Sequence, residues 1–367
     1  MSHPATSQRL LLFINPASGS GRGAGAGAEA VARFRSAGAD VRVVDPAPQA
    51  VTGVSRVPAH GVVTHGDLTD ALRTSIQQER PDAVVVVGGD GMVHAAVNVL
   101  AETEIPLGLV PAGTGNDFAR NFGVDRLSVR MAAEQIITSL VTGPRRVDLA
   151  RVELRPLPSP STAAEETTVE VRWVASGVNL GFDAVVNARA NALRWPTGRA
   201  RYVVAVLQEL WRYTAPALTV STTDQQGTTE VGTERTFVLS LLNGSYFGGG
   251  MKAAPGASVD DGLIDILWVP AMRPSRFLQV FPRVFSGGHA TVPEVSLAQV
   301  QTVDVAASDE ESGRAATHTR GDHRAASLPI VHGDGEAIGR LPVRITAVPG
   351  ALHLLVGQET ERPGTLD

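Results

Sequence analysis

The sequence predicts an α/β N-terminal domain with a parallel sheet, followed by a C-terminal antiparallel β-sandwich-like domain. Three observations lead to this fold class. Up to about residue 145, short apolar runs alternate with helical patterns, as in βαβ units. Beyond that point most periodic segments alternate apolar and polar residues, which is typical of antiparallel strands with one buried face. Three of the N-terminal apolar runs also end in loops rich in Gly, Asn, Ser and Thr.

The first domain is expected over residues 8–145. Its predicted strands are 10–14, 41–44, 83–87 and 107–110, and its predicted helices lie near 24–37, 70–79, 93–101 and 126–141. Asp67 or Thr69 is expected to cap the second helix, and Gly143-Pro144 is a normal stop signal for the last. Because strands and helices alternate, the sheet should be parallel and carry helices on its faces.

The second domain is expected over residues 146–357, with its final segment packing back on the first domain. Its predicted strands are 147–154, 168–174, 217–222, 236–241, 263–269 and 343–348, with one helix near 199–213. Three polar stretches, 155–168, 223–235 and 306–327, are interpreted as surface loops or insertions. The last of them has the composition of a disordered segment, and its role is open.

Composition excludes several classes of protein. The 367 residues are enough for two domains with cores of their own, and the net charge of −5 argues against nucleic acid as the main partner. The absence of cysteine excludes disulfides and thiolate metal sites. Segment 1–9 lacks the regions of a signal peptide, and no apolar run approaches the roughly 20 residues of a membrane span. We therefore expect a cytoplasmic protein, either soluble or peripheral at the inner face of the membrane.

The most informative motif is Gly88-Gly89-Asp90-Gly91, which directly follows the apolar run 83–87. A buried parallel strand that ends in such a turn exposes backbone N–H groups where an anion can sit. Glycine lets the backbone approach a phosphate closely, and Asp90 can hold the accompanying metal ion or orient the loop. The alternative is a plain surface turn, because turns also favour Gly and Asp.

Two further loops follow strands of the same predicted sheet. Asn15-Pro16-Ala17-Ser18-Gly19 follows strand 10–14, and Pro111-Ala112-Gly113-Thr114-Gly115-Asn116-Asp117 follows strand 107–110. If the strands are parallel neighbours, all three loops lie along one edge of the sheet. An edge lined with N–H donors, hydroxyls and two Asp residues suits a nucleoside triphosphate bound together with Mg²⁺.

A dinucleotide site is an alternative interpretation of the first loop. Gly21-x-Gly23-x-x-Ala26 follows a strand, and Asp40 and Asp45 lie at roughly the sequence distance of a ribose-binding carboxylate. Gly and Ala are abundant in this segment, so such a pattern arises easily from composition. We favour the phosphate-binding interpretation.

Taken together, the motifs resemble the diacylglycerol kinase catalytic-domain family, which includes bacterial soluble lipid kinases and sphingosine kinases. The N-terminal resemblance is carried by Asn15-Pro16-x-Ser18-Gly19, by the Gly-Gly-Asp-Gly turn and by Pro111-x-Gly113-Thr114-x-Asn116-Asp117-Phe118-Ala119-Arg120. Downstream it continues in Asn243-Gly244-Ser245-Tyr246-Phe247-Gly248-Gly249-Gly250-Met251, Asp261-Gly262-Leu263-Ile264-Asp265 and His332-Gly333-Asp334-Gly335-Glu336. These matches cover nearly the whole chain, and the set is highly specific.

The resemblance implies an NAD kinase- or diacylglycerol kinase-like first domain and an ATP-dependent lipid kinase that uses Mg²⁺. The default acceptor is diacylglycerol, which yields phosphatidic acid, while a sphingoid base, another glycerolipid or a polyprenol stays open. Lipid at a membrane surface and ATP are the expected partners, and a homodimer is compatible with the family. The residues expected to bind ATP are Asn15, Pro16, Ala17, Ser18, Gly19, Gly88, Gly89, Asp90, Gly91, Met92, Val93, His94, Thr114 and Asn116.

Carboxylates carry the expected chemistry. By resemblance, Glu336 is the general base that takes the proton from the lipid hydroxyl. Asp334 competes for that role, or instead orients the base or binds the metal; a hairpin turn is the plain alternative for both. Asp117 and Asp148 resemble carboxylates of a charge network near the metal, with a helix N-cap and a strand-end turn as alternatives.

A second Mg²⁺ site is also implied by resemblance. There Asp261 and the carbonyls of Ser258 and Leu263 would hold an ion that shapes the loop, and such mixed oxygen ligands suit a hard cation. Without the resemblance, the same residues would be interpreted as a turn between strands.

The sequence departs from the family pattern at two positions. Met92 stands where the family usually has Thr, which removes a hydroxyl and leaves one nucleotide contact, and the level of activity, open. His94 stands where Asn is frequent. It either forms hydrogen bonds in place of Asn or packs on its helix, and we favour packing.

Two other functions stay open. An NAD kinase-like enzyme shares the Gly-Gly-Asp-Gly loop but phosphorylates a soluble ribose, and the Asp117-Phe118-Ala119-Arg120 run and the Asp334-Gly335-Glu336 motif argue against it. A non-catalytic nucleotide- or lipid-binding protein is supported mainly by Met92, and the retained carboxylates argue against it.

A lipid acceptor needs an apolar cleft near a membrane surface. Trp195, Trp211 and Tyr213 accompany four arginines in segment 194–213, and such amphipathic segments can lie on anionic membranes. The alternative, which we favour from the sequence, is a core helix with solvated arginines. Phe277, Phe281 and Phe285 have helical spacing, which we interpret as packing, with lipid contact as the alternative.

Overall fold

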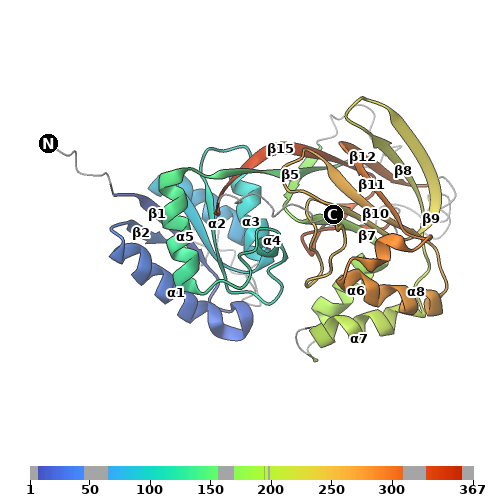
Figure 1. Cartoon of the computed structure of the whole chain (residues 1–367), viewed down its shortest axis with the longest axis horizontal. Helices are drawn as coiled ribbons and strands as arrows, with labels where there is room; N and C mark the ends of the chain where they lie inside the picture. Colours follow the sequence, from blue (N-terminus) through green and yellow to red (C-terminus); the bar gives the residue numbers. More distant parts are fainter. Residues whose placement is uncertain are drawn as a thin grey trace, which may run out of the picture. The chain divides into compact units, whose positions relative to one another are not determined.

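The computed structural model describes residues 7–44, 65–155, 169–193, 195–196, 199–308 and 328–357. The chain forms two compact units, Met1–Val147 with Gly350–Asp367, and Asp148–Pro349 (Figure 1). The first unit contains a parallel sheet with helices, and the second is built mainly from antiparallel strands. The predicted fold class is therefore confirmed.

The parallel sheet of the first unit has the strand order β4-β3-β1-β2, and the end of β15 adds a parallel neighbour to β4. Its strands are β1 (Arg9–Ile14), β2 (Asp40–Val43), β3 (Ala83–Gly88), β4 (Leu107–Pro111) and the last part of β15 (Val343–Leu355). Its helices are α1 (Ser18–Ser36), α2 (His65–Glu79), α3 (Asp90–Leu100), α4 (Asp117–Arg120) and α5 (Val129–Thr142).

The core of this unit fixes the strand ends. β3 is buried along its whole length, as its uninterrupted valines indicate. Phe34 of α1 and Ile136 of α5 join Leu12 and Val85 in one buried cluster on a single face of the sheet (Figure 1). Burial of each large side chain contributes about 1.5–3 kcal/mol to the stability of the fold. The ends of these strands, from which the loops begin, are therefore held firmly in place.

The second unit contains two antiparallel sheets that share β9 (Thr229–Leu242). The first half of β9 pairs with β8 (Ala217–Thr223), and the second half pairs with β7 (Gly177–Gly181) and β10 (Ile264–Pro270). The remaining strands are β5 (Arg145–Leu154), β6 (Glu170–Val174), β11 (Ser296–Val300), β12 (Thr302–Ala307), β13 (Ile330–Gly333) and β14 (Glu336–Arg340). Buried residues from both sheets, such as Val152 and Leu241, form one core between them, as in a sandwich.

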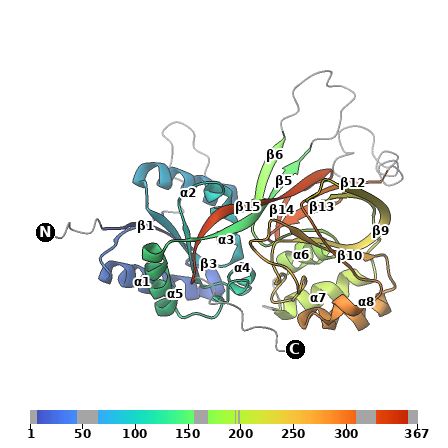
Figure 2. The same ribbon diagram turned by 45° about the horizontal axis from the view of Figure 1, so that its top comes forward.

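A helical layer also belongs to the second unit. It contains α6 (Phe182–Ala192), α7 (Arg199–Leu210), α8 (Pro274–Val280) and the 3₁₀ helices η1 (Phe281–Phe285) and η2 (Gly288–Thr291). In Figures 1 and 2, α7 lies on the outer side of α6, away from the strands. Of these helices the sequence predicted only α7. No helix in the described ranges is long and apolar enough to cross a membrane.

Segment 223–235 was predicted to be a loop, and this prediction is wrong. Residues 229–235 belong to β9 and pair with β8, where the hydroxyls of Thr223 and Thr229 are 3.2 Å apart. Threonine and valine favour an exposed strand because the branched side chain fits the pleated surface, so polarity alone gave the wrong element. Residues 156–168 and 309–327 of the other two expected loops lie outside the described residues, and Ala306 and Ala307 belong to β12.

Three helices begin earlier than predicted. α1 begins at Ser18 and α3 at Asp90, so the Gly21-x-Gly23-x-x-Ala26 pattern lies inside a helix instead of in a dinucleotide-binding turn. α2 begins at His65, which puts Asp67 in its first turn and not at its cap. There its charge is favourable to the helix dipole.

Candidate functional site

The loops after β1, β3 and β4 meet at the carboxyl edge of the parallel sheet. The backbone N–H groups of Ala112 and Gly113 donate to the carbonyl of Gly88 at 2.8 and 3.1 Å. A Cβ atom on Gly113 would lie 2.5 Å from the Cα of Gly89, and one on Gly19 would lie 2.3 Å from the carbonyl oxygen of Ala112. Only glycine allows such an approach, which explains why all three loops are rich in it.

Two helices begin at this edge. Gly89 is the N-cap residue of α3, and α1 starts directly after the Asn15-Pro16-Ala17 turn. The side-chain oxygen of Asn15 accepts a hydrogen bond from the N–H of Ala17 at 3.0 Å, which fixes that turn. Because the first N–H groups of a helix have no partner within the helix, two adjacent helix starts make an edge that attracts anions.

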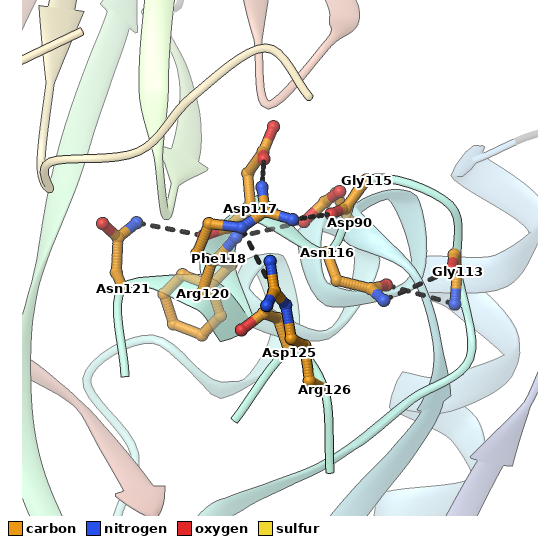
Figure 3. A network of polar contacts seen from close by, with 10 residues as sticks. All are labelled: Asp90, Gly113, Gly115, Asn116, Asp117, Phe118, Arg120, Asn121, Asp125 and Arg126. Atoms are coloured by element: carbon orange, nitrogen blue, oxygen red, sulfur yellow. Dashed lines mark hydrogen bonds and ion pairs between the residues drawn. The ribbon is translucent and has the colours of Figure 1, made fainter. Parts of the chain in front are cut away.

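Asp90 connects two of the loops. Its Oδ1 accepts a hydrogen bond from the N–H of Phe118 at 3.1 Å, which ties the start of α3 to α4 (Figure 3). Asp90 and Asn116 line a small hollow together with Gly88, Gly89 and Val93. The carboxylate is therefore held by the backbone at the edge where the sequence predicted a phosphate or metal site.

Asn116 shapes the loop after β4. It has a φ of 54°, and Asn tolerates this left-handed conformation better than most residues. Its Oδ1 accepts from the N–H of Gly113 at 3.1 Å and its Nδ2 donates to the carbonyl of Gly113 at 3.2 Å (Figure 3). Thr114 is exposed within the loop that these two bonds close.

Arg120 organises the charges beside this loop. Its guanidinium is 2.6 Å from Asp117 and 3.1 Å from Asp125, and it donates to the carbonyl of Gly115 at 3.2 Å (Figure 3). Asp125 was missed by the sequence analysis, because no motif marks it. Asp148 belongs to the second unit, so its predicted membership of one network with Asp117 stays a prediction.

Met92 and His94, the two departures from the family pattern, are both buried in α3. A Cβ atom on Gly88 would lie 2.8 Å from the Cγ of Met92, so this side chain packs directly behind the Gly-Gly-Asp-Gly turn. The burial of His94 is what the packing alternative predicted.

In the second unit, Asp334 and Glu336 occupy the turn between β13 and β14. The carboxylate of Asp334 accepts hydrogen bonds from the N–H groups of Ala175, Ser176 and Gly177 at 2.9, 2.7 and 3.3 Å. It therefore anchors the turn to the segment between β6 and β7. Glu336 is the first residue of β14 and is half-buried.

Carboxylates also gather around the 258–263 loop. The buried Asp148 accepts from the N–H of Gly262 at 2.7 Å, and Asp261 accepts from that of Leu263 at 3.0 Å. Burial raises the pKa of Asp261, and the negative charges of Asp148 and Asp260 add to the effect. A bound cation would offset this repulsion, and the oxygen donors fit Mg²⁺.

Within the described ranges, no group of three or more His, Cys, Asp or Glu side chains is arranged to hold a metal. A site at this loop would therefore depend on backbone carbonyls, which is the predicted set of Ser258 and Leu263 with Asp261. Asp265, which sequence reasoning missed, lies nearby. Burial, helped by the charge of Asp261, raises its pKa to about 7.

An apolar cavity lies between the helical layer and β9 and β10 of the second unit. Its wall includes Phe182, Val186, Val206, Val238, Leu267, Phe277 and Phe281. The rings of Phe277 and Phe281 stack with their centroids 5.2 Å apart, so they pack on each other as expected, but both also line the cavity. Sequence reasoning missed the cavity itself, because its wall comes from segments far apart in the chain.

One carboxyl group, that of Asp183, is found at the wall of this cavity. It accepts hydrogen bonds from the amide of Asn179, from the hydroxyl of Ser240 at 3.0 Å and from the N–H of Ala184 at 2.9 Å. Burial raises the pKa of Asp183 to about 7, although these hydrogen bonds oppose the shift.

We expect the free energy of unfolding to fall as the pH rises from about 4 to about 7. The folded chain keeps a proton on Asp183 that the unfolded chain has lost above the ordinary pKa of 3.8, so deprotonation favours unfolding by up to about 1.4 kcal/mol per pH unit. Asp183→Asn should flatten this dependence and leave a smaller slope from Asp265. Urea unfolding of both chains between pH 4 and pH 8 measures the two slopes. An equally steep decline in the variant would contradict the assignment.

Comparison with known proteins agrees with the motifs. Residues 9–152 match the family model of the diacylglycerol kinase catalytic domain, and residues 176–356 match that of the YegS C-terminal NAD kinase beta sandwich-like domain. A protein named diacylglycerol kinase from Mycobacterium tuberculosis (strain H37Rv) is 33% identical over 343 residues, which is 93% of each chain. One of the same name from Bacillus subtilis (strain 168) is 24% identical over 83% of this chain and 87% of its own.

A solved structure shares the fold. The crystal structure of a diacylglycerol kinase from Bacillus anthracis (strain Sterne) superimposes with a TM-score of 0.62 and 17% sequence identity. The match covers 96% of this chain and 98% of the other. Both units thus have counterparts in a single known chain.

Proposed function

The chain belongs to the diacylglycerol kinase catalytic-domain family, and on this basis we propose that it transfers the γ-phosphate of ATP to the hydroxyl of a lipid. The default acceptor is diacylglycerol, because the Mycobacterium tuberculosis relative carries that name and is 33% identical over 93% of both chains. The product would then be phosphatidic acid. A sphingoid base, another glycerolipid or a polyprenol is the next acceptor to test.

The observation that best supports a lipid as the acceptor is the apolar cavity of the second unit. Its wall is almost entirely apolar and includes several aromatic rings, as the walls of ligand pockets typically are. Each buried methylene contributes about 0.8 kcal/mol to binding, so this wall favours an alkyl chain. The ribose of a soluble dinucleotide would gain nothing from it.

On the donor side, we assign the phosphates of ATP to the three loops of the first unit. The support is the pair of helix starts, α1 and α3, together with the fixed carboxylate of Asp90. Asp90 would hold the ion that accompanies the nucleotide, and Mg²⁺ supplies charge neutralisation as the phosphoryl group moves. The Ser258, Asp261 and Leu263 set would hold a second ion that shapes its loop.

On the acceptor side, we assign Glu336 the role of general base. It would accept the proton of the lipid hydroxyl as that oxygen attacks the γ-phosphorus and ADP leaves. Asp334 would act as a positioning residue, and the support is the set of three backbone N–H groups that bind its carboxylate. The acceptor's insolubility implies that the reaction takes place at a membrane surface.

Transfer of labelled γ-phosphate from ATP to a panel of detergent-dispersed lipids tests this proposal. The panel contains diacylglycerol, a sphingoid base and a polyprenol, with NAD as a soluble acceptor and a parallel series in EDTA. Label in one lipid that EDTA abolishes supports a Mg²⁺-dependent lipid kinase and identifies the class of acceptor. Label in NAD would favour the NAD kinase-like alternative, and tight ATP binding without any transfer would favour a binding protein.

A further inference from the structure

Helix α7 is apolar on two neighbouring faces, one buried and one exposed. Its inner face contributes Val206 and Leu210 to a buried aromatic cluster. On its outer face Val203 and Leu207 are 51% and 48% exposed, and Trp211, directly after the helix, is 68% exposed. Residues four positions apart share one face of a helix, so these three side chains form a single line, which we call the docking stripe.

An exposed apolar line of this kind marks an interaction surface, because single scattered apolar residues are normal on a protein but contiguous ones are not. Trp195, just before α7, is 82% exposed and adds a second indole near the start of the helix. Tryptophan is enriched at membrane–water interfaces, where its ring is apolar and its N–H remains hydrated. The composition of this surface thus favours a lipid bilayer.

The amino-acid sequence of the segment that carries the docking stripe favours an anionic bilayer. Segment 194–213 contains four arginines and one acidic residue, Glu209. Glu209 forms an ion pair with Arg189 of α6, which offsets its negative charge, and Arg212 is exposed next to Trp211. Each basic residue near an anionic leaflet adds to binding. The segment is thus basic, whereas the chain as a whole has a net charge of −5.

The cavity is lined by the neighbouring face of the same helix. Val206 of α7 belongs to the cavity wall, whereas Val203 and Leu207, on the adjacent face, are half exposed. A helix that lies in the plane of the interface buries its outer apolar face in the headgroup region. Docking through this face would therefore bring the lipid phase within one helix diameter of the cavity.

We propose that the chain docks on anionic bilayers through the docking stripe Val203, Leu207 and Trp211, with α7 parallel to the membrane surface. The link between docking and the cavity rests on the proposed lipid kinase function. The docking itself rests only on the exposed side chains. A second copy of the chain is less suited to this surface. Stable protein interfaces bury about 800 Å² per partner, which a line of three side chains does not supply.

Vesicle co-sedimentation tests the docking. The full chain and the double variant Leu207→Ser/Trp211→Ser are compared on phosphatidylcholine vesicles with and without about one third phosphatidylglycerol. We expect wild-type binding to increase with the anionic lipid. The variant should bind these vesicles at least about tenfold more weakly than the wild type. Val231→Ser is the matched control, because Val231 is an equally exposed apolar residue (68%) on β9 of the same unit. It should bind like the wild type.

A second measurement separates this proposal from the proposed function. Transfer to a short-chain diacylglycerol below its micelle concentration needs no docking, so the double variant should retain it while losing transfer to diacylglycerol in vesicles. If no chain phosphorylates any lipid but the difference in sedimentation remains, docking stands and the kinase proposal fails. Equal sedimentation of variant and wild type would overturn the docking proposal whatever the activity. A dimer in light scattering that only the variant loses would overturn it in favour of self-association.

Discussion

Asp90→Asn is expected to lower kcat for phosphoryl transfer by about 100-fold or more while the chain keeps its fold. Asn can still accept the 3.1 Å hydrogen bond from the N–H of Phe118, so the tie between α3 and α4 remains. What the variant loses is the negative charge that we assign to Mg²⁺ and phosphate positioning, and groups that stabilise charge in a transition state typically contribute about 10²–10³ in rate. The measurement is kcat at saturating ATP together with the midpoint of urea unfolding.

Two companion variants make this result specific. Asp90→Ala removes both the charge and the hydrogen bond, so it should lose stability as well as activity. Asp125→Asn neutralises a carboxylate of the same network that binds Arg120 at 3.1 Å but does not belong to the three loops, so its kcat should change by less than about threefold. Wild-type kcat in Asp90→Asn, or an equal loss in Asp125→Asn, would exclude a special role for Asp90.

The first unit could be predicted from sequence because its signals are local. The valines of β3 and the stop at Gly143 mark their elements directly. The start of α1 could not be predicted, since Ser18 to Gly27 contains five glycines and intrinsic propensity opposes a helix there. Packing of Phe34 and Ala30 against the sheet overrides that propensity, and the helix extends back to the phosphate-binding edge.

The cavity could not be predicted for a different reason. Its wall combines Phe182 with Leu267 and Val284, about 100 residues apart, and no periodicity reports which distant segments meet. The Phe277 and Phe281 spacing indicated packing correctly but not the space beside it. The same limit applies to α7, where the sequence favoured a core helix and the structure shows a buried inner face and an exposed outer one.

The roles of Asp334 and Glu336 also could not be distinguished from the sequence alone. Sequence left the choice of base between them open, because both carboxylates lie in one turn. The contacts of Asp334 are made with N–H groups more than 150 residues away, and only the fold reveals them. A carboxylate held by three backbone N–H groups has a structural task in the turn, and its oxygens face the backbone of the segment that it anchors. We therefore keep Glu336 as the candidate for the base.

Glu336→Gln and Asp334→Asn are therefore expected to fail in different ways. Glu336→Gln should lower kcat by about 10²–10⁴-fold, the usual contribution of a general base. Because the isosteric amide keeps the shape of the side chain, it should change the free energy of unfolding less than Asp334→Asn does. Asp334→Asn retains one acceptor oxygen for three N–H groups. Each donor left unsatisfied costs about 1–3 kcal/mol, so this variant should be measurably less stable.

Urea unfolding and kcat, measured on both variants at one pH, decide the assignment. If Asp334→Asn is as stable as the wild type but inactive, and Glu336→Gln remains active, Asp334 is the base and the anchoring role is wrong. A pH profile adds an independent test. The rise of kcat/KM on the acid side reports deprotonation of the base in the free enzyme, so Glu336→Gln should remove that rise from its residual activity. Asp334→Asn, as a change in a positioning residue, should keep the rise.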